Sequence, residues 1–170
     1  MQWPDLSQVL GPVPWAVMGA VATRHYMPER MTKDLDVLVP VEDGREAARR
    51  LRERGWEERG QLTIGGSVWL SPEGVTLDLI EGAEPWCREA IAEAQTNRDE
   101  QGLPILPLPY LVLAKLRAGR ARDVGDLTQM LGLADDVARD RVRERVARYT
   151  PEDVDDLEAL IELGKLETGR

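Results

Sequence analysis

The chain contains a single cysteine, a single histidine and no phenylalanine among its 170 residues. The lone Cys87 excludes an internal disulfide framework and is typical of a reducing compartment. We expect a buried or neutral thiol there rather than a nucleophile. His25 is also alone, so a Cys/His zinc site or a Cys–His nucleophilic dyad would have to use one residue of each kind. Both chemistries therefore rank last.

Long apolar runs are missing as well. No stretch approaches the roughly 18 residues that a membrane-crossing helix needs, and the opening segment has prolines and no basic start. These absences predict a cytoplasmic protein with no membrane partner. The formal net charge of −9 argues against sequence-independent coating of nucleic acid, because such binding depends on Lys and Arg. The acidic balance agrees with a site that gathers divalent cations.

What is present is an ordinary globular composition, 42% hydrophobic and 31% charged. The first half alternates strand and helix patterns. Strands are expected within 15–22, at 34–39 and in the stretches 61–71 and 75–80, helices at 42–54 and 87–94, with Gly19 and Pro40 as turn or end signals. The tryptophans in or beside these apolar segments are expected to pack in the core or at its edge.

The second half is predicted to be helical. Helices are expected at 110–118, at 123–131 with Gly132 as its stop, at 135–149, and at 151–163 with Thr150 as N-cap and Gly164 as terminator. The whole pattern predicts an α/β (α+β) fold in which helices flank a sheet. We divide it into an α/β core at 1–104 and a helical C-terminal region at 105–170 packed on that core.

Acidic residues interrupt two of the predicted strands. Asp34 and Asp36 are two residues apart, so their side chains project to the same side, with α-carbons about 7 Å apart. Asp78 interrupts the later strand in the same way, and it joins the other two if the strands are neighbours. Three carboxylates can hold Mg²⁺ while leaving positions for substrate phosphates. A lone Asp-x-Asp often only faces water, but an EF-hand is excluded because Val39 occupies its glycine position.

The stretch VMGAVATRHYMPERMTKDLDVLVP resembles the signature of the DNA polymerase β-like nucleotidyltransferase superfamily. There a hydrophobic residue and a Gly-Gly or Gly-Ser pair precede an Asp-x-Asp. Gly19, Asp34 and Asp36 fill those positions, while Ala20 stands where the family has Gly or Ser. A rival alignment that starts at 66–67 and uses Asp78 would leave no second acid, so we prefer the first.

Two further motifs refine the resemblance. Arg30 and Thr32 match the Arg-x-Thr of the nucleotidyltransferase-like toxins of abortive-infection toxin–antitoxin systems, the group to which the chain is most similar. In LPYLVLAKLRAGRARDVGDL, the family's helical lysine and Arg-Asp-x-x-Asp correspond to Lys115, Arg122, Asp123 and Asp126. The resemblance implies that Lys115 neutralises the triphosphate or the departing pyrophosphate, whereas without it a solvated helix-surface lysine is the simpler interpretation.

The resemblance implies a nucleotidyltransferase-type mixed sheet and a metal-dependent nucleotidyltransferase. Such an enzyme transfers a nucleotide from an NTP to an acceptor hydroxyl on RNA, a protein or a small molecule, with Mg²⁺ or Mn²⁺ as cofactor. It also implies tRNA as one acceptor and an antitoxin protein as a partner. The implied metal ligands are Asp34, Asp36 and Asp78, which with Lys115 are also the catalytic residues; the implied nucleotide-binding residues are Gly19, Ala20, Arg30, Thr32, Lys115, Asp123 and Asp126.

Two other functions stay open. A catalytically inactive nucleotidyltransferase-like module that binds a nucleotide or partner is favoured slightly by Ala20 and by the overall acidity. A metal-dependent phosphate hydrolase that uses the same carboxylates ranks third. The arginine-rich segment RDRVRERVARY near the C-terminus would suit an RNA-facing surface, but its interspersed acids favour a solvated helix face.

Overall fold

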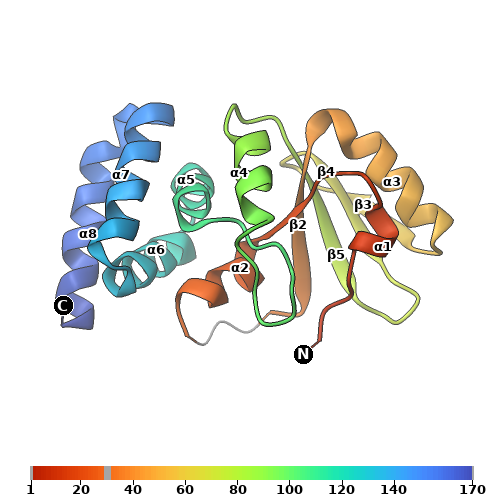
Figure 1. Ribbon diagram of the computed structural model, residues 1–170, viewed down its shortest axis with the longest axis horizontal. Coiled ribbons are helices and arrows are strands. Elements are labelled where there is room, and N and C mark those ends of the chain that lie inside the picture. The colour runs from red at the N-terminus through yellow and green to blue at the C-terminus, as the bar shows by residue number, and fades with distance from the viewer. Residues whose placement is uncertain (1, 29–31, 170) are drawn as a thin grey trace. The chain divides into compact units, whose positions relative to one another are not determined.

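The computed structural model describes residues 2–28 and 32–169. The chain divides into two compact units, one formed by residues 1–22 and 31–106 and the other by residues 23–30 and 107–170. The first, called the sheet unit below, holds all five strands, and the second, the helical unit, holds the C-terminal helices (Figure 1).

The sheet unit is built on a mixed sheet with strand order β1-β2-β5-β4-β3. Strands β2 and β5 are parallel, and the other neighbouring pairs are antiparallel. The expected mixed sheet is therefore confirmed. The strands are β1 (Ala16–Met18), β2 (Asp34–Pro40), β3 (Glu57–Gln61), β4 (Gly66–Leu70) and β5 (Thr76–Gly82).

Burial alternates along the central strands, which gives the sheet one closed and one more open face. On the closed face lie Leu35, Val37, Trp69, Leu77 and Leu79, all fully buried. Since side chains alternate along a strand, the residues between them project to the other face, which is half-buried to exposed along much of its length. The core of the sheet unit therefore lies mainly on one side.

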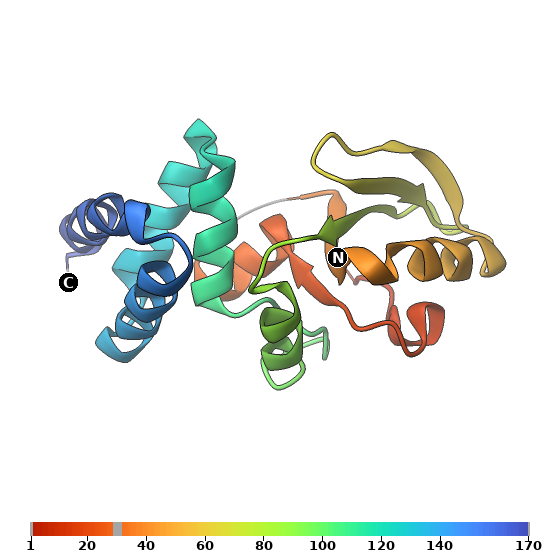
Figure 2. The same cartoon turned by 90° about the horizontal axis from the view of Figure 1, so that it is seen from above.

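Helices lie on both sides of the sheet, as Figures 1 and 2 show for α3 (Gly44–Glu53) and α4 (Cys87–Ala94). Helix α3 packs on the closed face, where the guanidinium of Arg52 lies 5.2 Å from the centre of the Trp69 ring. Helix α4 begins near the open face, because a Cβ added to Gly82 would meet Cys87 Sγ at 2.6 Å. The short α1 (Ser7–Leu10), the 3₁₀ turn η1 (Val41–Asp43) and α2 (Gly19–Tyr26) complete the first part of the chain.

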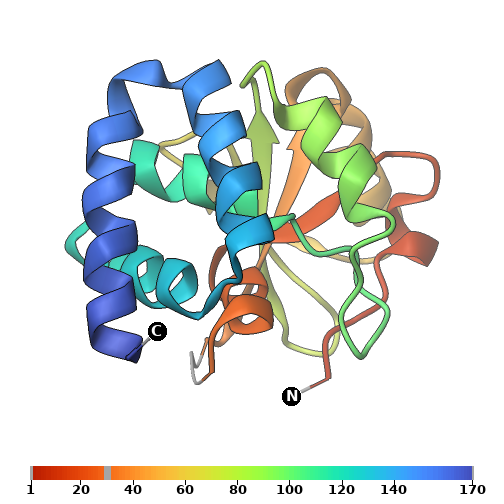
Figure 3. The same ribbon diagram turned by 60° about the vertical axis from the view of Figure 1, so that its left-hand side comes forward.

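The helical unit contains four consecutive helices, and Figure 3 shows the last two side by side. They are α5 (Leu108–Ala118), α6 (Ala121–Leu133), α7 (Asp136–Tyr149) and α8 (Val154–Thr168), with the 3₁₀ turn η2 (Pro151–Asp153) before α8. Asp135 caps α7 by accepting a hydrogen bond from the Ala138 N–H at 2.7 Å. The helical C-terminal region predicted from the sequence is present.

Two glycines that were expected to end helices lie inside them. Gly132 is within α6 and Gly164 is within α8, which continues to Thr168. A Cβ on Gly132 would lie 2.3 Å from the Gly164 carbonyl oxygen, and one on Gly164 would lie 2.3 Å from the Thr128 carbonyl oxygen. The two glycines let the backbones of α6 and α8 approach each other. Thr150, the expected N-cap, makes no side-chain cap hydrogen bond.

Strand β3 was not predicted. Its sequence, EERGQ, is charged, and every residue of it is exposed. As an edge strand it pairs only with β4, with a register shift between Glu58 and Gly60, so no apolar alternation marks it. The expected core positions of the tryptophans and the burial of Cys87 are confirmed. Among the described residues, no helix combines the length and apolarity needed to cross a membrane.

Candidate functional site

The three predicted metal ligands lie on neighbouring strands of the sheet unit. Asp36 and Asp78 are register partners on the parallel strands β2 and β5, and Asp34 is paired with Thr76 two residues earlier. Because residues two apart share a face, all three carboxylates project from the open face. The condition stated from the sequence, that the two strands are neighbours, is met. We call Asp34, Asp36 and Asp78 the acidic cluster.

The acidic cluster is electrostatically coupled. Asp34 is exposed, whereas Asp36 and Asp78 are half-buried. Burial raises the pKa of the Asp78 carboxyl above its usual value, and the negative charge of Asp34 raises it further. Asp78 therefore holds a proton more readily than an isolated aspartate.

Gly19 lies directly against the acidic cluster. It follows β1 and begins α2 with a φ of +61°, a conformation that favours glycine. A Cβ at this position would lie 1.9 Å from Asp36 Oδ2 and 2.5 Å from Asp36 Cγ. The absence of a side chain thus lets the carboxylate of Asp36 approach the backbone at the start of a helix.

Replacing Gly19 with alanine is therefore expected to destabilise the protein in two ways, through backbone strain and through the clash with Asp36. Gly74 provides a matched control, because it has a φ of +85° but no atom within 4 Å of an added Cβ. Gly74→Ala should show the strain alone. In urea unfolding, Gly19→Ala should cost at least about 1 kcal/mol more than Gly74→Ala. Equal losses would show that the contact between Gly19 and Asp36 is not tight.

The acidic cluster supplies the right donors for a hard divalent cation, since carboxylate oxygens are the ligands that Mg²⁺ and Mn²⁺ prefer. Within residues 2–28 and 32–169, however, no group of three His, Cys, Asp or Glu side chains is placed to hold a metal ion together. The carboxylates share a face without converging on one point. Like charges repel one another, and a bound cation would offset that repulsion.

The residues before the acidic cluster have local roles. The Thr32 hydroxyl donates to the Asp34 carbonyl oxygen at 3.2 Å and accepts from the Asp34 N–H at 3.3 Å, which shapes the entry to β2. Ala20 is the second residue of α2 and has no polar side chain, so only backbone N–H groups could serve a phosphate there. Arg30 lies outside the described residues. Phosphate contacts of Ala20, Arg30 and Thr32 stay predictions.

In the helical unit, Lys115 forms a buried ion cluster with two aspartates. Its Nζ donates to Asp123 Oδ1 at 3.2 Å and to Asp126 Oδ2 at 2.6 Å, and the lysine is only 6% exposed. Burial acts to raise the pKa of Asp123, but hydrogen bonds from Arg120 and Lys115 outweigh it and lower that pKa. The solvated lysine considered as the alternative is wrong, because Lys115 joins α5 to α6 inside the unit. Its contact with phosphate stays a prediction.

The arginine-rich segment belongs to α7, and several of its arginines are used inside the helical unit. Arg139 is buried and donates to the carbonyl oxygens of Leu131 and Gly132 at 2.9 and 3.1 Å. Arg143 pairs with Glu158 of α8 at 2.6 Å, and Arg145 donates to the Tyr110 hydroxyl at 3.0 Å. These arginines hold helices together, so they do not form a continuous basic surface.

The geometry also weighs against the rival alignment. Ser67 alternates with Val68, the register partner of Asp78, and therefore projects to the closed face. Its hydroxyl is buried and accepts a hydrogen bond from Trp69 Nε1 at 2.8 Å. Val68 itself lies beside Asp78 on the open face. Sequence reasoning missed this neighbour, although the alternation in GSVWLS separates Val68 from Ser67 and Trp69.

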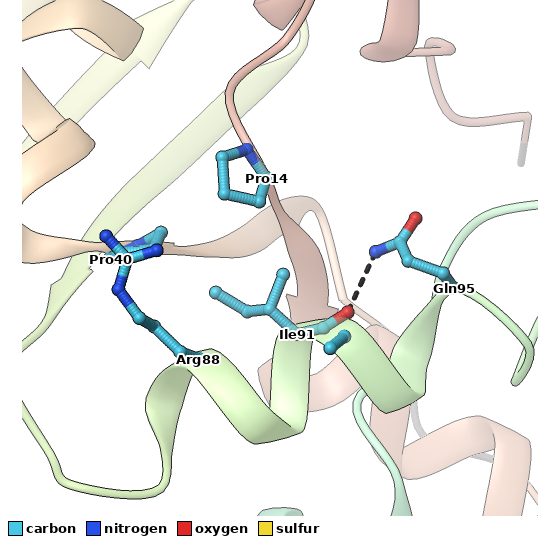
Figure 4. A pocket seen from close by; sticks show the side chains of 6 residues that line it. Pro14, Pro40, Arg88, Ile91 and Gln95 are labelled. Carbon is cyan, nitrogen blue, oxygen red and sulfur yellow. Dashed lines mark hydrogen bonds between the residues drawn. The ribbon is translucent and has the colours of Figure 1, made fainter.

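A pocket at another place in the sheet unit is unlike the acidic cluster. It has a volume of about 220 Å³ and mainly apolar walls, formed by Pro14, Pro40, Arg88, Ile91, Ala92 and Gln95 (Figure 4). Gln95 Nε2 donates to the Ile91 and Trp15 carbonyl oxygens, and Arg88 pairs with Glu42 at 2.7 Å. Because these polar groups are satisfied within the chain, the pocket offers no catalytic constellation.

Comparison with known proteins shows similarity to two structures of the antibiotic-resistance factor ANT(2'')-Ia. A solution structure has a TM-score of 0.46 and 20% identity, over 88% of this chain and 82% of that chain. A crystal structure in complex with adenylyl-2''-tobramycin has a TM-score of 0.45 and 16% identity, over 88% and 87%. No protein-family model and no curated protein matches the chain. Its function has to be argued from its own residues.

Proposed function

We propose that the chain is a metal-dependent nucleotidyltransferase that moves a nucleotide from an NTP to an acceptor hydroxyl. The observation that supports this most strongly is the register of β2 with β5, which sets Asp36 beside Asp78 with Asp34 on the same face. In addition, helix α2 begins at Gly19, where its backbone lies against the Asp36 carboxylate. Carboxylates next to a helix N-terminus suit a nucleotide whose phosphates are bridged by a cation.

In this proposal Asp34 and Asp36 would hold Mg²⁺ or Mn²⁺, and Asp78 would either complete the metal site or act as the base. The metal would neutralise charge on the phosphate oxygens. The acceptor oxygen attacks the α-phosphorus in line and forms a new O–P bond, while the hydroxyl proton passes to Asp78. The bond from the α-phosphorus to the bridging oxygen breaks, and pyrophosphate leaves with its electron pair. The backbone N–H groups after Gly19 orient the phosphates.

The proposal is tested by incubating the purified chain with each α-³²P-labelled NTP, with Mg²⁺ or Mn²⁺, and with total RNA, a protein mixture or tobramycin as acceptor. We expect label transfer to one acceptor class and release of unlabelled pyrophosphate. Because Asp36 is central to the acidic cluster, Asp36→Asn should lower the transfer rate by at least about 100-fold. Asp155→Asn, at an exposed position of α8, is the matched control and should leave the rate unchanged.

Each alternative outcome has a distinct signature. Transfer that survives in Asp36→Asn contradicts the proposed site. Release of labelled nucleoside monophosphate without transfer, when no acceptor is added, indicates a phosphate hydrolase. Label on tRNA, together with growth arrest on expression, would support the toxin interpretation. If co-expression of the product of an adjacent gene restored growth, that product would be identified as an antitoxin.

A binding module without catalysis is the second candidate. It is favoured by Ala20, which lacks the hydroxyl of the family's serine, and by the acidic cluster, whose carboxylates do not converge in the described residues. Such a module would bind Mg²⁺ and NTP, as measured by calorimetry, and would transfer no label to any acceptor. Ala20→Ser should then leave transfer absent, whereas in an enzyme that lacks only this hydroxyl it should increase transfer.

A further inference from the structure

Apolar side chains lie beside Asp78 on the open face of the sheet. In the antiparallel register of β5 with β4, Asp78 is opposite Val68, Thr76 is opposite Leu70, and Ile80 is opposite Gly66. Val68, Leu70 and Ile80 therefore share the face of the acidic cluster. All three are half-buried. We call these three residues the apolar shelf.

The apolar shelf departs from the usual pattern of such strands. An antiparallel strand with one open face normally alternates apolar residues inside with polar residues outside. Strand β4 already buries Trp69 on the closed face, yet it presents Val68 and Leu70 on the open one. Next to Val68, Gly60 of β3 has no side chain, and a Cβ added to it would meet no atom within 4 Å. Space is therefore available at the end of this row.

The order of groups across the sheet assigns the apolar shelf a place in the reaction. The row runs from Met18 beside the Gly19 turn, through Asp36 and Asp78, to Val68. If phosphates bind at the Gly19 turn, in-line displacement places the acceptor on the opposite side of the α-phosphorus from the departing pyrophosphate. That side faces β4, where Val68 is the register partner of Asp78, the group proposed to receive the hydroxyl proton.

We propose that the apolar shelf is the acceptor subsite and selects a hydroxyl compound with an aromatic or aliphatic face next to the reacting hydroxyl. This inference rests on the proposed transferase function. The apolar face of the acceptor covers Val68, Leu70 and Ile80, while its hydroxyl points to Asp78. A small polyol without such a face gains nothing from the shelf, because it buries no apolar surface. Val68 is the central specificity-determining residue.

The test uses methyl NMR of protein labelled in its Ile, Leu and Val methyl groups, with benzyl alcohol as the apolar-faced probe and glycerol as the matched polyol. Benzyl alcohol is expected to shift the methyl signals of Val68, Leu70 and Ile80 in a saturable way. Glycerol should leave them unchanged. Ile64, which is 70% exposed at the tip of the β3–β4 hairpin, is the internal control and should not respond.

Val68→Thr keeps the shape of the side chain but places a hydroxyl on the shelf. It should weaken benzyl alcohol binding at least about fivefold, while the affinity for Mg²⁺ and ATP stays within about twofold, since Val68 takes no part in the nucleotide site as proposed. The inference is overturned if glycerol shifts the same methyl signals, if Ile64 responds as strongly as Val68, or if Val68→Thr has no effect.

Failure of the shelf and failure of the transferase proposal give different results. If Mg²⁺ and ATP bind and label is transferred while benzyl alcohol leaves the shelf unchanged, only the acceptor subsite is wrong. If benzyl alcohol binds the shelf but neither Mg²⁺ nor ATP binds, the transferase proposal is wrong and the assignment of the shelf as its acceptor subsite falls with it.

Discussion

Replacing Lys115 with methionine is expected to destabilise the helical unit by about 3–5 kcal/mol, because the change removes the buried ammonium group that Asp123 and Asp126 share. Asp123 is 1% exposed and Asp126 is 8% exposed, so water cannot replace the ammonium group easily. Arg120 still reaches Asp123, at 2.8 Å, but Asp126 loses its 2.6 Å hydrogen bond from Lys115. Methionine keeps the length of the side chain, so lost packing contributes little.

Urea unfolding followed by circular dichroism measures the effect of Lys115→Met. Lys165→Met is the matched control, since Lys165 forms an exposed ion pair with Glu162 at 2.9 Å, and such pairs contribute roughly 0–1 kcal/mol. Adding Asp123→Asn and Asp126→Asn to Lys115→Met should recover part of the loss, because the negative charges of the two buried side chains are then removed as well. A loss no larger than that of the control would mean that the ion cluster is not buried.

Gly164→Ala is expected to cost about 2–3 kcal/mol, because the new methyl group meets backbone atoms that cannot turn away. The added Cβ would lie 2.3 Å from the Thr128 carbonyl oxygen and 2.7 Å from the Gly132 nitrogen, so α6 and α8 would have to separate. In an isolated helix the same change is favourable by about 1 kcal/mol. The sign of the effect therefore reports the packing of the two helices.

Gly125→Ala is the matched control for Gly164→Ala. Gly125 lies in α6 and has no atom within 4 Å of an added Cβ, so this change should stabilise the protein by roughly 0.5–1 kcal/mol. Thermal unfolding of both variants gives the comparison. If Gly164→Ala were as favourable as Gly125→Ala, the close approach of α6 and α8 would be contradicted.

The ion cluster of Lys115 and the contact between Gly132 and Gly164 could not be predicted from the sequence of the helical unit. Gly132 and Gly164 follow apolar helical patterns, and a glycine in that position usually ends a helix. Only the neighbouring helix shows that they serve close packing instead. Lys115 likewise sits on a helix whose pattern does not reveal a burial partner, because Asp123 and Asp126 lie on the next helix along the chain. The sequence pattern of one helix carries no information on its contacts with another helix.

The sheet unit was predicted more completely where apolar alternation is strong. The strands that carry Asp34, Asp36 and Asp78 alternate acids with fully buried residues, and this pattern predicted both the strands and the shared face. Strand β3 was not predicted, because an exposed edge strand needs no apolar residues and so shows no apolar alternation. The contact between Gly19 and Asp36, and the position of Val68 beside Asp78, depend on strand register and could not be derived from the sequence.

The most direct test of the acidic cluster is a pH titration of the Asp78 carboxyl carbon by ¹³C NMR, with and without Mg²⁺. In the absence of Mg²⁺ the pKa of Asp78 should lie above its ordinary value, because of burial and the charge of Asp34. Mg²⁺ should lower that pKa, because a cation shared with Asp34 and Asp36 favours the ionised carboxylate. A pKa of Asp78 that does not change on addition of Mg²⁺ would contradict a common cation site of the three aspartates.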